Sequence, residues 1–199
     1  MGVQRGLVLL AAILSSGARA DQLLLAGTLP PGVTALSVTA GQPLSGVRVD
    51  RGLLPWLDVG VYLDSALGRF FRPGVGSRAR IFRKGCGGVT ARLALSYVMP
   101  RLHGGASWGP RKLSRSANGE LGVGADVGFG ASCSVGVFAE LGTLIDTDFS
   151  TVRSHAFLHT VAGLEWAPVR PLSLLAKVGE LRGFHGTRAI FSGGAALRF

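Results

Sequence analysis

Apolar and polar residues alternate one by one along much of the chain. Between residues 57 and 64, the odd positions are all Leu or Val, and the even positions are Asp, Gly, Tyr and Asp. A period of two is typical of a β-strand, because successive side chains of a strand point to opposite faces. The first two of the strands predicted in this way alternate weakly, so ten strands are expected and eight are the alternative. The predicted strands are residues 33–41, 45–52, 56–65, 74–83, 88–98, 120–130, 134–143, 157–166, 172–181 and 189–199.

The connections between these strands fall into two groups. Counted back from the last strand, every second connection is short: residues 167–171, 131–133, 84–87 and 53–55. Of the other connections, residues 180–188, 145–154, 99–118 and 65–73 are longer, and only 42–44 is short. Transmembrane β-barrels have short turns on the periplasmic side and longer loops outside. The spacing therefore favours an antiparallel up-and-down barrel with both ends in the periplasm.

The composition is unusual for a soluble globular protein. Only 16% of the residues are charged, 47% are hydrophobic and 31 are Gly, so something other than a closed core must cover the apolar surface. Beyond the N-terminus, no apolar run is long enough for a spanning helix, which leaves a closed barrel as the way to cross a bilayer. The apolar face would then contact lipid. The opposite face would line a lumen with Arg48, Asp50, Asp58, Asp64, Arg78, Arg80, Arg92, Glu120, Asp126, Glu140, His159, Glu165, Lys177 and Arg198.

These lumen charges have two interpretations. Long Arg and Glu side chains can fill the small interior of an eight- to ten-stranded barrel, and their ion pairs would then plug and stiffen it. Alternatively, the same charges line a narrow passive path for ions or small solutes. The first interpretation is favoured because both signs of charge are mixed along the same face.

Residues 1–20 have the features of a secretory signal peptide. A short basic start is followed by an apolar run and by Ala18-Arg19-Ala20, a suitable cleavage site, so a barrel domain of residues 21–199 is expected after export. Cys86 and Cys133 fall in two predicted periplasmic turns beside neighbouring strands. One disulfide could form there, although two free thiols are equally compatible with the count.

The last strand carries a further signature. Its alternate positions are Phe191, Gly193, Ala195, Leu197 and the carboxy-terminal Phe199. This pattern resembles the C-terminal β-signal of Gram-negative outer-membrane proteins, in which the barrel assembly machinery reads such a strand. Across residues 21–199 the chain resembles a small barrel of the OmpA-transmembrane or OmpX-like type. The resemblance implies an outer-membrane location and assembly through Phe191, Leu197 and Phe199, and it is not specific for a function.

The predicted outer connections are rich in basic residues: Arg69, Arg72, Arg101, Arg111, Lys112, Arg115, Arg153, Arg182 and Arg188. With a net charge of +10, they suit lipopolysaccharide phosphates or acidic surface glycans. Simple solvated loops are an equally good explanation. Export makes nucleic acid an unsuitable partner, and a monomer without cofactor is expected.

Enzymatic activity is the least favoured hypothesis. Asp146, Asp148, His155 and His185 lie in or beside the outer loops, where an Asp/His set could activate water in a membrane-embedded lipid-modifying enzyme or protease. No motif fixes their geometry, and the histidines lack metal-ligand spacing. The sequence therefore predicts a non-enzymatic barrel with a structural or surface-interaction role.

Overall fold

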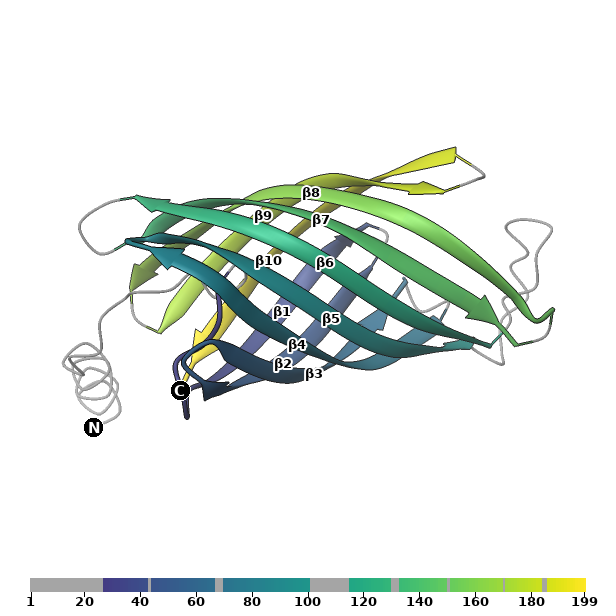
Figure 1. Ribbon diagram of the computed structural model, residues 1–199, viewed down its shortest axis with the longest axis horizontal. Helices are drawn as coiled ribbons and strands as arrows, with labels where there is room; N and C mark the ends of the chain where they lie inside the picture. The colour runs from purple at the N-terminus through teal and green to yellow at the C-terminus, as the bar shows by residue number, and fades with distance from the viewer. Residues whose placement is uncertain are drawn as a thin grey trace, which may run out of the picture.

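The computed structural model is a closed barrel of ten antiparallel strands (Figure 1). It describes residues 27–42, 44–66, 70–100, 115–129, 133–149, 151–169, 171–183 and 186–199. The predicted barrel and its ten strands are confirmed, and the alternative of eight strands is wrong. The strands are β1 (Thr34–Gln42), β2 (Ser45–Leu54), β3 (Leu57–Ser65), β4 (Phe70–Lys84), β5 (Gly87–Pro100), β6 (Ser116–Phe129), β7 (Val135–Asp148), β8 (Arg153–Val169), β9 (Leu172–Gly183) and β10 (Gly186–Arg198).

Each strand pairs with its neighbours in sequence, and β1 pairs with β10 to close the barrel. Backbone hydrogen bonds in both directions between Thr34 and Phe199 tie the start of β1 to the end of β10. We call this the terminal end of the barrel, at the left of Figure 1, and the opposite end the far end. Closure leaves no unpaired sheet edge, as a strand structure in lipid requires.

No helix in the described ranges is long and apolar enough to span a bilayer. The predicted signal peptide, residues 1–20, lies outside the described residues.

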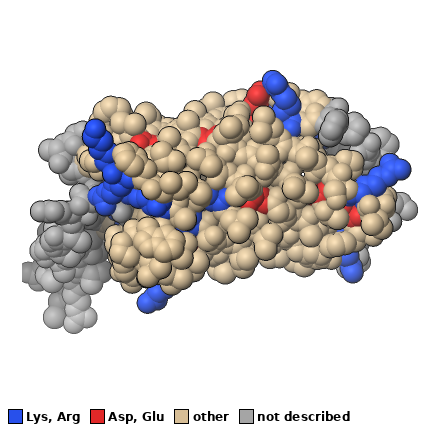
Figure 2. Space-filling view, in the orientation of Figure 1, with Lys and Arg blue, Asp and Glu red and all other residues tan. Residues whose placement is uncertain are grey.

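The outer surface of the barrel is apolar. Along β6, Leu121 is 59% exposed and Val127 53%, whereas Asp126 between them is only 5% exposed. The same alternation runs round the barrel, and Figure 2 shows a side of the molecule on which uncharged residues predominate. A soluble barrel would have the reverse arrangement. The inside is not wholly polar, because Val98, Val161 and Leu175 are buried there.

The strands extend beyond their predicted limits, chiefly at the far end. The β9–β10 pairing continues from Glu180 and Ala189 to Gly183 and Gly186, so the predicted long connection 180–188 is wrong. Likewise, β7 and β8 remain paired as far as Asp148 and Arg153. Alternation marks only the part of a strand with one face in an apolar medium. Beyond that part the strands remain hydrogen-bonded, but their residues no longer alternate between apolar and polar. The strand lengths predicted from alternation are therefore too short.

A short segment before β1 folds into the terminal end. Thr28 and Leu29 are each 1% exposed, and Leu29 packs with Ala35, Ala196 and Val33 in a small apolar cluster. Gly32, with a positive φ of 80°, allows the turn that leads from this segment into β1. The Gly32 and Gly52 backbones fasten that turn to β2. The segment therefore covers part of the lumen opening.

Candidate functional site in the lumen

Charged side chains inside the barrel form a first cluster near the terminal end, which we call the terminal cluster: Arg48, Asp50, Asp58 and Arg78. Arg78 donates two hydrogen bonds of 3.0 Å to the two carboxylate oxygens of Asp58 and reaches Asp50 at 3.7 Å. Asp58 is fully buried, and Arg78 is 5% exposed. Such a bidentate contact compensates the loss of water from both charges.

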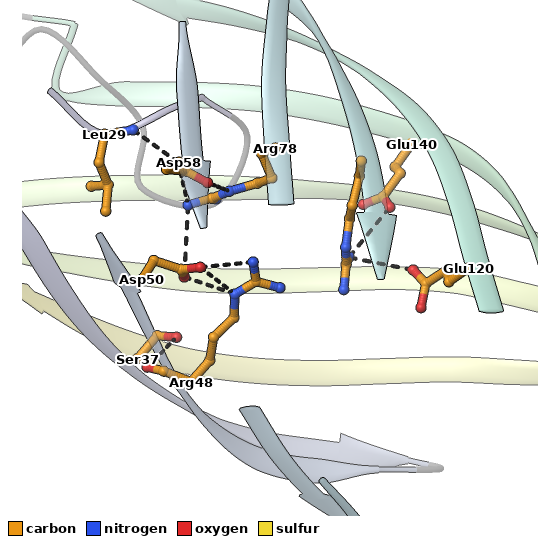
Figure 3. A network of polar contacts seen from close by, with 9 residues as sticks. Leu29, Ser37, Arg48, Asp50, Asp58, Arg78, Glu120 and Glu140 are labelled. Atoms are coloured by element: carbon orange, nitrogen blue, oxygen red, sulfur yellow. Dashed lines mark hydrogen bonds and ion pairs between the residues drawn. The ribbon is translucent and has the colours of Figure 1, made fainter. Parts of the chain in front are cut away.

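The rest of the terminal cluster satisfies the remaining groups of these carboxylates. The Nε atom of Arg48 lies 2.7 Å from both oxygens of Asp50. The backbone N–H of Leu29 donates to Asp58 at 3.0 Å, so the segment before β1 is bound directly to the cluster (Figure 3). The four charged side chains come from β2, β3 and β4, and they link these strands across the lumen wall.

A second group, the middle cluster, consists of Arg92, Glu120, Glu140 and His159. One terminal nitrogen of Arg92 lies 3.4 Å from Glu140 and 3.6 Å from Glu120. The Nε2 atom of His159 lies 3.4 Å from the same oxygen of Glu140. The group draws on β5, β6, β7 and β8. Because Arg78 and Arg92 are register partners, the two clusters lie side by side (Figure 3).

A third contact lies toward the far end of β3 and β4. Arg72 donates to Asp64 at 2.5 Å, and the Tyr62 ring has Arg48 and Arg72 each 5.9 Å from its centroid. Tyr62 thereby connects this pair to the terminal cluster through cation–π contacts. Polar contacts therefore follow β2, β3 and β4 from the terminal end toward the far end.

The other predicted lumen residues are also directed inward. Asp126 and Glu165 are buried, and Arg80 and Lys177 are half-buried. Arg198 donates to the hydroxyl of Ser173 at 3.4 Å. The three predicted assembly residues, Phe191, Leu197 and Phe199, are exposed on the outer side.

Glycines make room for the larger groups of the lumen. A Cβ added at Gly142 would overlap the ring of His159, its register partner on β8. A Cβ at Gly74 would overlap the ring of Tyr62 in the same way. These side chains therefore lie flat against the glycines of the neighbouring strand, and the packing fixes the positions of His159 and Tyr62.

The two cysteines form a disulfide at the terminal end. The bond joins Cys86, in the β4–β5 turn, to Cys133, just before β7, with their Cα atoms 5.7 Å apart. Of the alternatives that the sequence left open, the structure contains the bonded form. Cys133 has a positive φ of 53°, so a residue that would ordinarily avoid this conformation is held there beside the bond.

Two groups could in principle perform chemistry. Asp146 and His155 are register partners near the far end, whereas His185 lies outside the described residues. In the middle cluster, the ligand atoms of Glu120, Glu140 and His159 lie within 4.8 Å of one another, as a metal site requires. However, Arg92 already neutralises these carboxylates and would repel a cation, so the arrangement favours an ion-pair network over a metal centre.

Sequence reasoning missed Thr28 and Leu29. They lie before the first predicted strand. Leu29 binds Asp58 through its backbone N–H, a group that nearly every residue has, so the residue type does not indicate this contact. Pro30, Pro31 and Gly32 do signal a turn, but a turn alone does not indicate that the preceding residues enter the lumen.

Comparison with known proteins reveals similarity in structure and not in sequence. No protein-family model and no curated protein sequence matches the chain. A bacterial polysaccharide outer membrane secretin matches 81% of the chain with a TM-score of 0.52 and 11% identity, and the chain spans 57% of that protein's length.

Two smaller barrels are also similar. The N-terminal β-barrel domain of Pseudomonas aeruginosa OprF matches 86% of this chain and 100% of its own length, with a TM-score of 0.39 and 11% identity. Ail of Yersinia pestis matches 85% of this chain and 99% of its own, with a TM-score of 0.25 and 12% identity. The closed ten-stranded barrel and the secretin match together establish that this chain has the fold of the outer-membrane β-barrels.

Proposed function

We propose that this protein is a non-enzymatic barrel of the Gram-negative outer membrane with a sealed lumen, which serves as a rigid scaffold for contacts at the cell surface. The observation that carries the proposal is the combination of an apolar outside with a lumen whose wall is lined by buried and half-buried ion pairs. Leu29 and Thr28 add a second obstruction at the terminal end. That end would face the periplasm, and the far end would face outward.

Sealing is favoured over conduction because the charged groups of both clusters form ion pairs with one another. Asp58, Asp50 and Arg78 are each at most 5% exposed, so little of their polar surface is left for passing ions. Beside the middle cluster, the cavity bordered by Arg78, Arg92 and Glu140 holds only about 20 Å³, roughly the space of one water molecule. A narrow passive channel is the second candidate.

Planar-bilayer recording distinguishes the two candidates. The wild-type protein is expected to leave the conductance at baseline, whereas replacing Arg92, Glu120 and Glu140 with alanine in a chain that also lacks Thr28 and Leu29 should produce open steps, because both the middle cluster and the obstruction at the terminal end are then removed. The exposed Arg182→Ala variant serves as the control and should remain silent. Reproducible wild-type steps that disappear in Arg92→Ala would contradict a sealed lumen and support a channel.

The far end suits contacts with anionic surface groups. Its described basic residues Arg115, Arg153, Arg182 and Arg188 are exposed, whereas its acidic residues Asp146 and Asp148 are partly buried. The prediction that Arg72 lies in an outer loop is wrong, because Arg72 belongs to β4 and pairs with Asp64 inside the barrel. Basic side chains in such positions can bind the phosphates of lipopolysaccharide. Four other basic residues that were predicted in the outer connections lie outside the described residues: Arg69, Arg101, Arg111 and Lys112.

This contact predicts a measurable loss of binding. Replacing Arg182 and Arg188 with glutamine should weaken the binding of lipopolysaccharide to the purified barrel severalfold, and added salt should reduce the difference, because charge interactions at a surface are screened. Arg83→Gln, an exposed arginine at the terminal end, is the matched control. Equal binding by all three proteins would exclude the far end as the contact.

A further inference from the structure

The outer wall of the barrel contains a hollow over β2, β3, β4 and β5. It has a volume of about 510 Å³ and is bordered mainly by apolar side chains. Eight residues of the outward-facing parity form its sides. Six of them are apolar, namely Val49, Val59, Val61, Val75, Leu93 and Leu95, and the other two are Arg51 and Ser77. A barrel wall is ordinarily convex, so a groove of this size in the outer surface is a candidate binding site for an apolar ligand.

The strand register explains where the hollow lies. Gly60 pairs with Gly76, and Gly76 pairs with Ala94, and because these residues face inward, the floor of the hollow is formed by their backbone. The outward residues on either side of this row form two parallel rows, with Val61 beside Val75 in one of them. The groove therefore crosses several strands, and apart from Ser77 and Arg51 its sides are apolar.

Two charged residues border the groove, and of these Asp50 points into the lumen and is only 3% exposed. Arg51 is exposed and follows the outward parity of β2, three residues before that strand ends at Leu54 on the terminal side. An arginine on the lipid-facing side is tolerated near the membrane interface and is costly at mid-depth. Its position thus indicates the level of lipid head groups, with the apolar trough extending from it toward the membrane centre.

From these features we infer that the groove binds the acyl chain of a glycerophospholipid of the periplasmic leaflet, with the lipid phosphate on Arg51. The inference rests on the proposed outer-membrane location. A guanidinium can bind two phosphate oxygens at once, and the apolar trough matches a hydrocarbon chain in chemistry and position.

A second copy of this chain fits less well. It would need to bring an acidic group to Arg51, but the described acidic residues of the strands lie mostly on the inward face. Glu180, which follows the outward parity of β9, lies at the far end and already contacts Arg182 at 3.5 Å. Charge complementarity therefore favours a lipid over a protein.

The test compares lipid retention among matched variants. Each protein is produced from the full chain by export in a Gram-negative host and is inserted into phosphatidylcholine vesicles that contain a minor fraction of phosphatidylglycerol. It is then extracted into mild detergent. Native mass spectrometry counts the phosphatidylglycerol molecules that remain bound. Wild type should retain one, and Arg51→Gln should retain about tenfold less, because a charge-assisted hydrogen bond to the phosphate is lost.

Val61→Trp should have the same effect by filling the trough. Its control is Val178→Trp, since both valines are 58% exposed and Val178 lies on a different wall. Arg83→Gln controls for a general loss of charge at the terminal end. Both controls should retain the lipid. The difference in gel mobility between heated and unheated samples, which a folded barrel shows and an unfolded one lacks, checks that every variant is folded.

Each other outcome overturns the inference. Equal retention by wild type, Arg51→Gln and Val61→Trp would mean that the groove does not select a lipid, and a lipid-free dimer would identify a second copy as the occupant. A protein that does not insert into vesicles at all would instead overturn the proposed location, and the groove assignment with it.

Discussion

Replacing Arg78 with alanine is expected to destabilise the barrel by about 3–5 kcal/mol, the range for removing one partner of a buried ion pair. The loss should be large because Arg78 contacts both Asp58, which is fully buried, and Asp50, which is 3% exposed. Without the guanidinium, two carboxylates remain in the lumen with reduced compensation. Guanidinium-induced unfolding of the vesicle-inserted protein measures the effect.

A paired variant separates the lost charge balance from lost packing. Arg78→Met combined with Asp58→Asn removes both charges and keeps similar volume, so it should recover more than half of the stability lost in Arg78→Ala. The exposed ion pair of Arg182 and Glu180 is the control, and breaking it should cost no more than about 1 kcal/mol. A loss below that value for Arg78→Ala would show that the terminal cluster does not hold β2, β3 and β4 together.

Breaking the disulfide is the other change with a large expected effect. The bond between Cys86 and Cys133 spans 47 positions of sequence and limits the freedom of the unfolded chain. Disulfides of this kind typically contribute about 2–4 kcal/mol. The double variant Cys86→Ser with Cys133→Ser should therefore unfold at lower denaturant concentration than wild type.

Reductant provides the control for this prediction. Adding it should lower the unfolding midpoint of wild type to that of the double variant and leave the variant unchanged. Identical midpoints for oxidised and reduced wild type would mean that pairing of β4 with β5 and of β6 with β7 already fixes both turns.

The sequence predicts the barrel well because the apolar outer face and the polar lumen require different residues at alternate positions of each strand. Leu121 and Val123 must differ from Gly122 and Gly124 when one face contacts hydrocarbon and the other a polar lumen, and this difference is visible residue by residue. The alternation ends where the apolar outer face of the barrel ends. The outer part of β9, up to Gly183, therefore escaped prediction although its hydrogen bonds continue.

The contacts inside the lumen were less accessible to prediction. Alternation assigns Arg78 and Asp58 to the inward face, but only the register makes them direct neighbours across β3 and β4. The approach of Arg92 to both Glu120 and Glu140 further depends on the curvature of the closed wall. The sequence of one strand is enough to predict which of its side chains face inward. Predicting which side chains contact one another requires the relative positions of several strands.

The central claim, that the apolar face of the strands lies in lipid and the polar face lines a lumen, is tested most directly along β6. Single cysteines would be placed in turn at Leu121, Gly122, Val123, Gly124, Ala125, Asp126 and Val127, with the native cysteines replaced by serine. A polarity-sensitive fluorophore on each would be read in phospholipid vesicles containing a nitroxide-labelled lipid. The result expected is strong quenching by the nitroxide-labelled lipid at the four odd positions and little quenching at the three even ones. Uniform quenching along the strand, or quenching at the even positions, would contradict a membrane-spanning barrel with this orientation.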